Sequence, residues 1–166
     1  MHIFVSIPRQ QLGVYTDTGE LLRHYPVSTA ARGSGERNGS LCTPGGRHII
    51  RAKIGAGCVE NAVLVGRRPT GEIYSPELGA RFPGRDWILT RILWLSGCEK
   101  GRNRLGEVDT MRRYIYIHGT PDSTVLGAPG SHGCIRMANR DIIELFELVP
   151  AYTVVEIDAT GVLLNQ

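Results

Sequence analysis

The sequence Tyr-Ile-Tyr-Ile-His-Gly-Thr occupies positions 114–120, and Ser-His-Gly-Cys-Ile-Arg-Met occupies positions 131–137. If the first segment is a strand, its two tyrosines and His118 share one face, and its two isoleucines share the other. We expect the isoleucines to enter the core and His118 to lie at the strand's end above it. Glycines and prolines in positions 121–130 allow the chain to fold back, which would return Cys134 to His118.

These segments carry the groups that cysteine acyl transfer needs: a thiol, an imidazole to take and return its proton, and backbone donors for an oxyanion. Cys134 supplies the thiol and His118 the imidazole. Gly133 allows a positive φ, which would help aim the N–H groups of Gly133 and Cys134 at the developing charge. The sequence therefore predicts a cysteine nucleophile with His118 as its general base.

Zinc binding is the alternative interpretation of the same residues. His118, His132 and Cys134 form a partial ligand set, but a structural zinc site needs four ligands, and no carboxylate lies beside these residues. A catalytic zinc site also needs an oriented second shell. The pattern favours the nucleophile, so we expect no metal and no other cofactor.

The other cysteines, Cys42, Cys58 and Cys98, are spaced too widely for the paired motifs that bind zinc or carry redox chemistry. In a reducing compartment all four cysteines should be free thiols. Away from Cys134 we expect them to be small buried hydrophobes.

Short segments rich in branched and aromatic residues, separated by glycine-containing connections, run through most of the chain. They predict strands at positions 2–7, 11–15, 21–28, 48–54, 63–66, 90–95, 114–118 and 153–157. The first three should form an antiparallel meander. Asn139 is expected to be the N-cap of a helix that Pro150 ends. Many short strands with one helix predict a mainly β sandwich or barrel with a packed C-terminal helix, in a single domain of residues 1–166.

Composition excludes several classes of protein. A formal charge of +3, spread along the chain with Arg67-Arg68 and Arg112-Arg113 as local pairs, does not predict nucleic-acid binding. No window approaches the roughly 20 apolar residues of a membrane span. The start at Met1 has no cationic segment, and its apolar stretch ends at Pro8, unlike a signal peptide. We therefore expect a cytoplasmic protein, or a periplasmic one if Met1 follows the removal of a leader.

Positions 118–120 and 131–136, with Cys134 placed 16 positions after His118, resemble the signature of YkuD-type L,D-transpeptidase catalytic domains. Thr-Pro-Gly-Gly at positions 43–46 is similar to the family's Thr-Pro-x-Gly element. The likeness spans nearly the whole chain and implies the YkuD fold.

The resemblance implies roles for the matching residues. Cys134 matches the nucleophile and His118 the general base. The residue that orients the imidazole matches Gly119, which offers only its backbone carbonyl. Arg136 could bind a substrate carboxylate through its guanidinium. The implied cleft residues are Ser131, His132 and Gly133, and the substrate-binding residues are Arg136 and Tyr116.

The resemblance also implies a substrate, the stem peptide of bacterial peptidoglycan, cut after the L-centre of its diamino acid third residue with release of D-alanine. The thioester then passes to an amine, giving a 3→3 crosslink, or to water, giving a tripeptide. Because the sequence shows neither an export signal nor a wall-binding module, we expect an L,D-carboxypeptidase of peptidoglycan recycling. The alternatives are a transpeptidase that forms 3→3 crosslinks or exchanges D-amino acids, and a non-catalytic muropeptide-binding domain. Since carbapenems acylate the cysteine of family members, Cys134 should be a carbapenem target.

Overall fold

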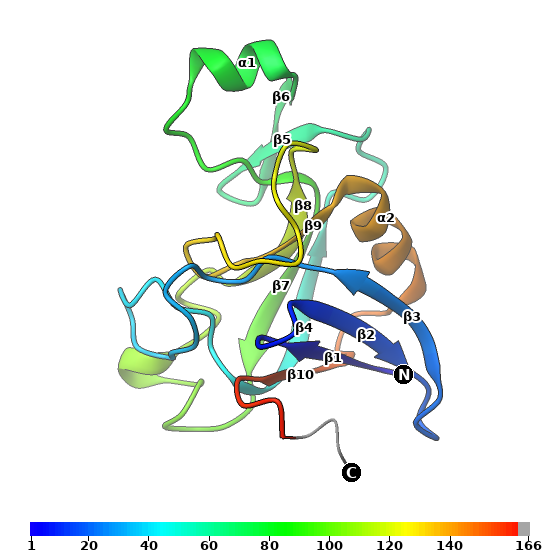
Figure 1. Ribbon diagram of the computed structural model, residues 1–166, viewed down its shortest axis with the longest axis vertical. Helices are drawn as coiled ribbons and strands as arrows, with labels where there is room; N and C mark the ends of the chain where they lie inside the picture. Colours follow the sequence, from blue (N-terminus) through cyan, green and yellow to red (C-terminus); the bar gives the residue numbers. More distant parts are fainter. Residues whose placement is uncertain (163–166) are drawn as a thin grey trace.

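A computed structural model describes residues 1–162 and shows a curled β-sheet with a helix packed against it (Figure 1). The elements are β1 (His2–Ser6), β2 (Gln11–Tyr15), β3 (Leu21–Pro26), β4 (Gly46–Ile54), β5 (Ala62–Val65), β6 (Arg68–Ile73), α1 (Pro76–Arg81), β7 (Leu89–Gly97), a 3-10 turn (Gly106–Val108), β8 (Tyr116–Thr120), β9 (Ile135–Ala138), α2 (Asn139–Leu148) and β10 (Val154–Asp158). The last four residues of the predicted domain lie outside the described range.

The strands of the described chain hydrogen-bond into one sheet. Its main path is β3-β2-β1-β10-β4-β7-β5-β6, and β8 and β9 branch from β7. The antiparallel meander predicted for the first three strands is confirmed, with Gly19 at φ +89 in the turn after β2. The predicted mainly β class is confirmed, in the form of one sheet that curls upon itself.

The core lies between the inner face of the curled sheet and α2. Alternate strand residues are buried there, as the pleat requires. They meet Ile142, Leu145 and Phe146 from one side of α2, which packs on β7, β8 and β9. Each large aliphatic side chain buried in this way stabilises the fold by about 1.5 to 3 kcal/mol. Lys53 Nζ donates to the carbonyls of Phe146 and Val149, so a cation satisfies the C-terminal end of α2.

The structure corrects the expected elements in four places. Strands β6 and β9 and helix α1 were not anticipated, and α1 buries no residue, so no apolar periodicity marks it. Ser75 accepts a hydrogen bond from Leu78 N at the start of α1. Asn139 is not an N-cap, because Ala138 holds that position, and the Asn139 side chain is buried in contacts with Thr90 and Asn61.

The hairpin of β5 and β6, together with α1, extends beyond the main sheet on the side where β8 and β9 end (Figure 1). The segment that follows α1 then returns to begin β7 at Leu89. This arrangement sets residues of both the hairpin and the returning segment beside the β8–β9 pair. Within the described residues, no helix is long and apolar enough to cross a membrane.

Candidate active site

The parallel pairing of β8 and β9 brings the two halves of the sequence motif together. Ile117 pairs with Ile135 and His118 pairs with Arg136. Cys134 comes directly before β9, so the alternation of side chains puts it on the same sheet face as His118. The two isoleucines are fully buried on the core side. The structure therefore returns Cys134 to His118 across a strand pair.

The Cys134 thiol sits against the backbone at the start of β8. Its Sγ accepts a hydrogen bond from Tyr116 N at 3.3 Å and donates to Tyr114 O at 3.4 Å. Burial raises the pKa of Cys134 to about 12, and the nearby Asp86 carboxylate adds to the effect of burial. The Tyr116 N–H and two arginines oppose the rise without reversing it. At neutral pH the free protein therefore holds a thiol here.

His118 supplies an unprotonated nitrogen to the same cleft. It lies inside β8, not at its end as expected, and is fully buried. Its Nδ1 lies 2.7 Å from Gly119 O, where only an N–H can bond a carbonyl, so Nε2 carries the lone pair. Nε2 has no hydrogen-bond partner among the described residues. Burial lowers the pKa of His118, and the hydrogen bond to Gly119 opposes this only in part.

Gly119 is required by close packing behind the imidazole. A Cβ at this position would collide with Asn139 Oδ1 and with Leu89 O. Asn139 is held there by Thr90 Oγ1 at 2.7 Å and by Asn61 Oδ1 at 2.9 Å. With no side chain at 119, α2 begins directly against β8, and the backbone carbonyl of Gly119 contacts the His118 ring, as the resemblance implied.

Two hydroxyls fix the turn that presents Cys134. Ser131 Oγ donates to Cys134 O and accepts from Gly133 N, and Thr43 Oγ1 donates to Gly133 O at 2.8 Å. Gly133 has φ +134, a region that residues with a Cβ rarely adopt. Because the turn already uses the Gly133 N–H, only the Cys134 N–H remains from the pair expected to face an oxyanion. The Thr-Pro element of the sequence thus contacts the turn before Cys134 directly.

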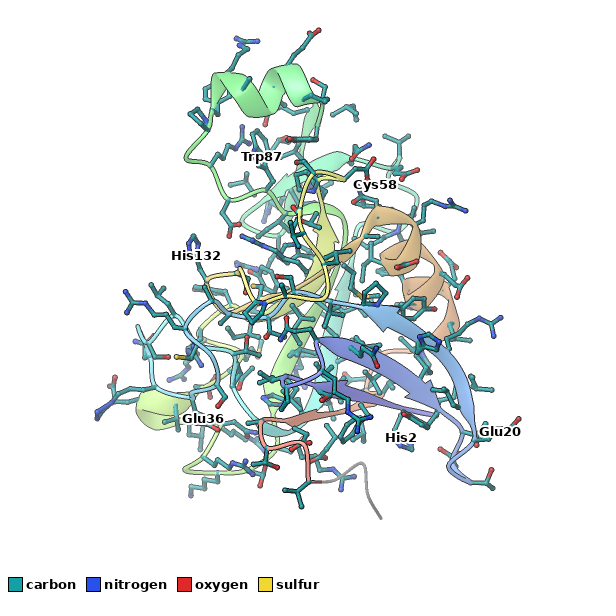
Figure 2. All side chains as sticks on the ribbon, viewed as in Figure 1. His2, Glu20, Glu36, Cys58, Trp87 and His132 are labelled. Carbon is teal, nitrogen blue, oxygen red and sulfur yellow. The ribbon has the colours of Figure 1, made fainter. Side chains whose placement is uncertain are left out.

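His118 and Cys134 line one cleft of about 490 Å³. Of the other residues expected there, Tyr116, Ser131, His132 and Arg136 also line it. Figure 2 shows His132 at the outer edge of the loop before β9, where it is exposed. The structure adds Arg67, Arg113 and Asp86 to the cleft. The two arginines had a sequence signal as local pairs, but their positions relative to the motif had none.

Charges in the cleft are unevenly paired. Arg136 donates to Asp86 Oδ1 and to Gly130 O, each at 3.1 Å, so its guanidinium already has a carboxylate. The binding of a substrate carboxylate by Arg136 stays a prediction. Three arginines against the one carboxylate of Asp86 leave the cleft positive.

The structure also bears on the predicted burial of the cysteines and on the alternative of a zinc site. All four cysteines are free. Contrary to the expected burial, Cys98 is exposed and Cys42 and Cys58 are half-buried. Among residues 1–162, no group of three histidine, cysteine or acidic side chains is arranged to hold a metal ion.

Comparison with known proteins identifies a matching family and relatives with similar sequences. The family model of the YkuD L,D-transpeptidase catalytic domain matches residues 1–157. The YkuD proteins of Bacillus licheniformis and Bacillus subtilis are 46% identical over 46 residues and 45% identical over 47 residues. Each aligned segment covers 28% of this chain, and 28% and 29% of the two relatives.

Solved structures share the fold at low identity. An L,D-transpeptidase mutant of Enterococcus faecium has a TM-score of 0.56 at 18% identity, over 95% of this chain and 49% of that one. The Mycobacterium smegmatis L,D-transpeptidase has a TM-score of 0.54 at 19% identity, over 95% and 58%. L,D-transpeptidase 3 of Mycobacterium tuberculosis, with a faropenem-derived adduct, has a TM-score of 0.56 at 16% identity, over 94% and 59%. Since the family model spans nearly the whole sequence, this chain belongs to the YkuD family of L,D-transpeptidase catalytic domains.

Proposed function

We propose that Cys134 attacks the carbonyl at the L-centre of the diamino acid in a peptidoglycan stem peptide, releases the terminal D-alanine, and passes the acyl group to water. One observation carries this proposal: the unpartnered Nε2 of His118 and the Cys134 thiol line one cleft on the same face of the β8–β9 pair. A buried polar atom without a partner calls for an explanation, and a base awaiting its proton supplies one.

The acylation step follows from the resting protonation states. As Sγ attacks the carbonyl carbon, the thiol proton moves to Nε2 of His118 and the carbonyl becomes an oxyanion. The Gly119 carbonyl, hydrogen-bonded to Nδ1, stabilises the resulting imidazolium. When the oxyanion collapses, the C–N bond breaks and Nε2 returns the proton to the leaving amine of D-alanine. Because burial raises the pKa of Cys134 and so favours the thiol, the step needs His118 to accept the proton.

Hydrolysis repeats the same steps with water. Nε2 takes a proton from a water molecule, whose oxygen adds to the thioester carbon. The C–S bond then breaks, and the proton on the imidazole goes back to sulfur. General-base help of this kind contributes roughly 10²- to 10⁴-fold to such steps. The products are a tripeptide with a free carboxylate and the regenerated thiol.

The charge of the cleft supports an anionic substrate. Stem peptides carry free carboxylates, and the cleft holds an excess of arginine over carboxylate. Charge-assisted hydrogen bonds from arginine to carboxylate are among the strong polar contacts in proteins.

A second cavity supports the alternative acceptor, the amine of another stem peptide. It measures about 610 Å³ and shares Asp86, His132 and Arg136 with the cleft. Tyr74 and Trp87 also line it, and Figure 2 shows Trp87 on the segment that follows α1. An acceptor strand bound there would lie across the Asp86–Arg136 ion pair from the thioester. The amine of that acceptor would have to pass this ion pair to reach the thioester. A water molecule would not, which is why hydrolysis is our first choice.

The test is to incubate the protein with a purified tetrapeptide muropeptide and to identify the products by mass spectrometry. We expect tripeptide and D-alanine, with 3→3 dimers as a minor product. Cys134→Ala should abolish turnover, whereas a triple alanine variant at positions 42, 58 and 98 should keep it. A majority of dimers or exchange products would replace hydrolysis by transpeptidation. Binding without any turnover would favour a muropeptide-binding domain. In intact-protein mass spectra, a carbapenem adduct should form and should be lost in Cys134→Ala.

A further inference from the structure

A tight hairpin places one arginine at the mouth of the cleft. The turn between β5 and β6 has Gly66 at φ +55 and Arg67 at φ +63, and Val65 pairs with Arg68 across it. Two central residues with positive φ are the mark of a type I′ hairpin, whose twist matches that of the strands. Arg67 therefore holds a backbone conformation that residues with a side chain seldom adopt, and it does so at the hairpin tip.

Aromatic groups hold the guanidinium of Arg67 in place. Its carbon lies 4.7 Å from the centre of the Trp94 ring and 4.8 Å from that of Tyr114. One terminal nitrogen donates to Tyr116 Oη at 3.1 Å. Stacking on ring faces fixes the plane of an arginine fork while leaving its other edge open to a planar anion.

Arg67 differs from the other two arginines of the cleft in what it has left to bind. Arg136 is paired with Asp86, and Arg113 donates to Gly35 O, Ser40 Oγ and Cys42 O. Among residues 1–162, no carboxylate lies within ion-pair distance of Arg67. Its only hydrogen bond to a described residue goes to a neutral hydroxyl, which leaves several N–H donors for a ligand.

Tyr116 lies between this guanidinium and the reacting sulfur and contacts both. The backbone N–H of Tyr116 contacts Cys134 Sγ, and its hydroxyl contacts Arg67. The guanidinium of Arg67 is thus separated from Cys134 Sγ by about the length of one tyrosine residue, from its backbone N–H to its hydroxyl. The terminal carboxylate of D-alanine is too near the scissile amide to span that gap. A carboxylate at the end of a diamino acid side chain, several carbons from the scissile carbonyl, fits it.

We propose that Arg67 binds the free carboxylate at the far end of the diamino acid side chain and so selects stem peptides in which that group is neither amidated nor missing. The inference rests on the proposed function, because it takes the stem peptide as the substrate. It assigns to Arg67 the carboxylate contact that the sequence motif suggested for Arg136.

The test compares two tetrapeptides that differ in one group. One has diaminopimelic acid as its third residue, and the other has the side-chain carboxylate of that residue amidated. For the wild-type protein, kcat/KM for D-alanine release should be about 10- to 100-fold higher with the free acid, the range expected for a hydrogen-bonded charge pair. Arg67→Ala should remove this preference by lowering only the rate with the acid, and Arg67→Lys should restore part of it. Arg68→Ala, an exposed neighbour in the same hairpin, should keep the wild-type ratio.

A preference that survives in Arg67→Ala, or equal losses with both peptides, would overturn the inference. Loss of the preference in Arg136→Ala alone would return the role to Arg136. Calorimetric binding of both peptides to Cys134→Ala separates this inference from the proposed function. If no peptide is turned over but the acid still binds more tightly in an Arg67-dependent manner, the carboxylate site stands and the proposed reaction fails. Equal binding of both peptides, or binding of neither, rejects the site.

Discussion

Replacing Thr43 with valine would remove a buried hydroxyl from behind the turn that precedes Cys134 while keeping the shape of the side chain. Thr43 is fully buried, and its Oγ1 donates to Gly133 O at 2.8 Å and accepts from Ala30 N at 2.9 Å. In Thr43→Val both backbone groups would be buried without partners. Each such group costs about 1 to 3 kcal/mol, so the free energy of unfolding should fall by about 2 to 6 kcal/mol. That is a large share of the roughly 5 to 15 kcal/mol that stabilises a typical domain.

Urea unfolding of Thr43→Val and Thr43→Ser measures this effect against a matched control. Serine keeps the hydroxyl and removes one methyl group, which costs about 1 kcal/mol. Because Gly133 precedes Cys134, the rate of D-alanine release should also fall further in the valine variant, assayed where both variants remain folded. Equal unfolding midpoints for valine and serine would refute the view that this hydroxyl ties the turn to the loop before β4.

Four further predictions concern the imidazoles and the cleft. His118→Ala should lower kcat by roughly 10²-fold or more in steady-state assays, while exposed His132→Ala should cost less; the reverse order would exchange their roles. Because burial lowers the pKa of His118, wild-type activity should persist below pH 6.5 before it falls, and a loss that begins above pH 6.5 would contradict a neutral buried base. Asp86→Ala should raise the fraction of crosslinked dimers in the muropeptide assay by opening the passage to the second cavity, and an unchanged fraction would remove the ion pair as a barrier. Burial lowers the pKa of His48 from 6.5 to about 4, so the unfolded chain binds the proton first, and stability should fall by about 3 kcal/mol between pH 6.5 and 4. His48→Gln should flatten this slope in denaturant titrations, and an unchanged slope would assign it to other groups.

Local pattern was enough to predict much of the fold. The alternation around Ile117 predicted a strand with its isoleucines in the core, and the sequence before Pro150 predicted a C-terminal helix; both are confirmed. Two of the missed elements, β6 and α1, lacked such a pattern. Strand β6 is almost wholly exposed and α1 buries nothing, so neither shows the contrast between buried and exposed positions on which periodicity depends. Asn139 was misread because a buried asparagine and a capping asparagine look alike in sequence.

The sequence by itself predicted which groups of the two motif segments meet in the cleft. Cys134, His118 and the Gly119 carbonyl belong to two short segments whose strand character and connecting loop are local properties. Only the tertiary structure decided the surroundings of those groups. Among the described residues, His118 Nε2 has no hydrogen-bond partner and Arg67 has no carboxylate partner, whereas Thr43 contacts Gly133 and Arg136 pairs with Asp86. Each of these depends on segments far apart in the chain, as with Arg67 and Tyr116, 49 positions apart. Hydrogen bonds and burial depend on which segments lie side by side in the folded chain, and a local sequence pattern does not show which distant donor will lie beside a given acceptor.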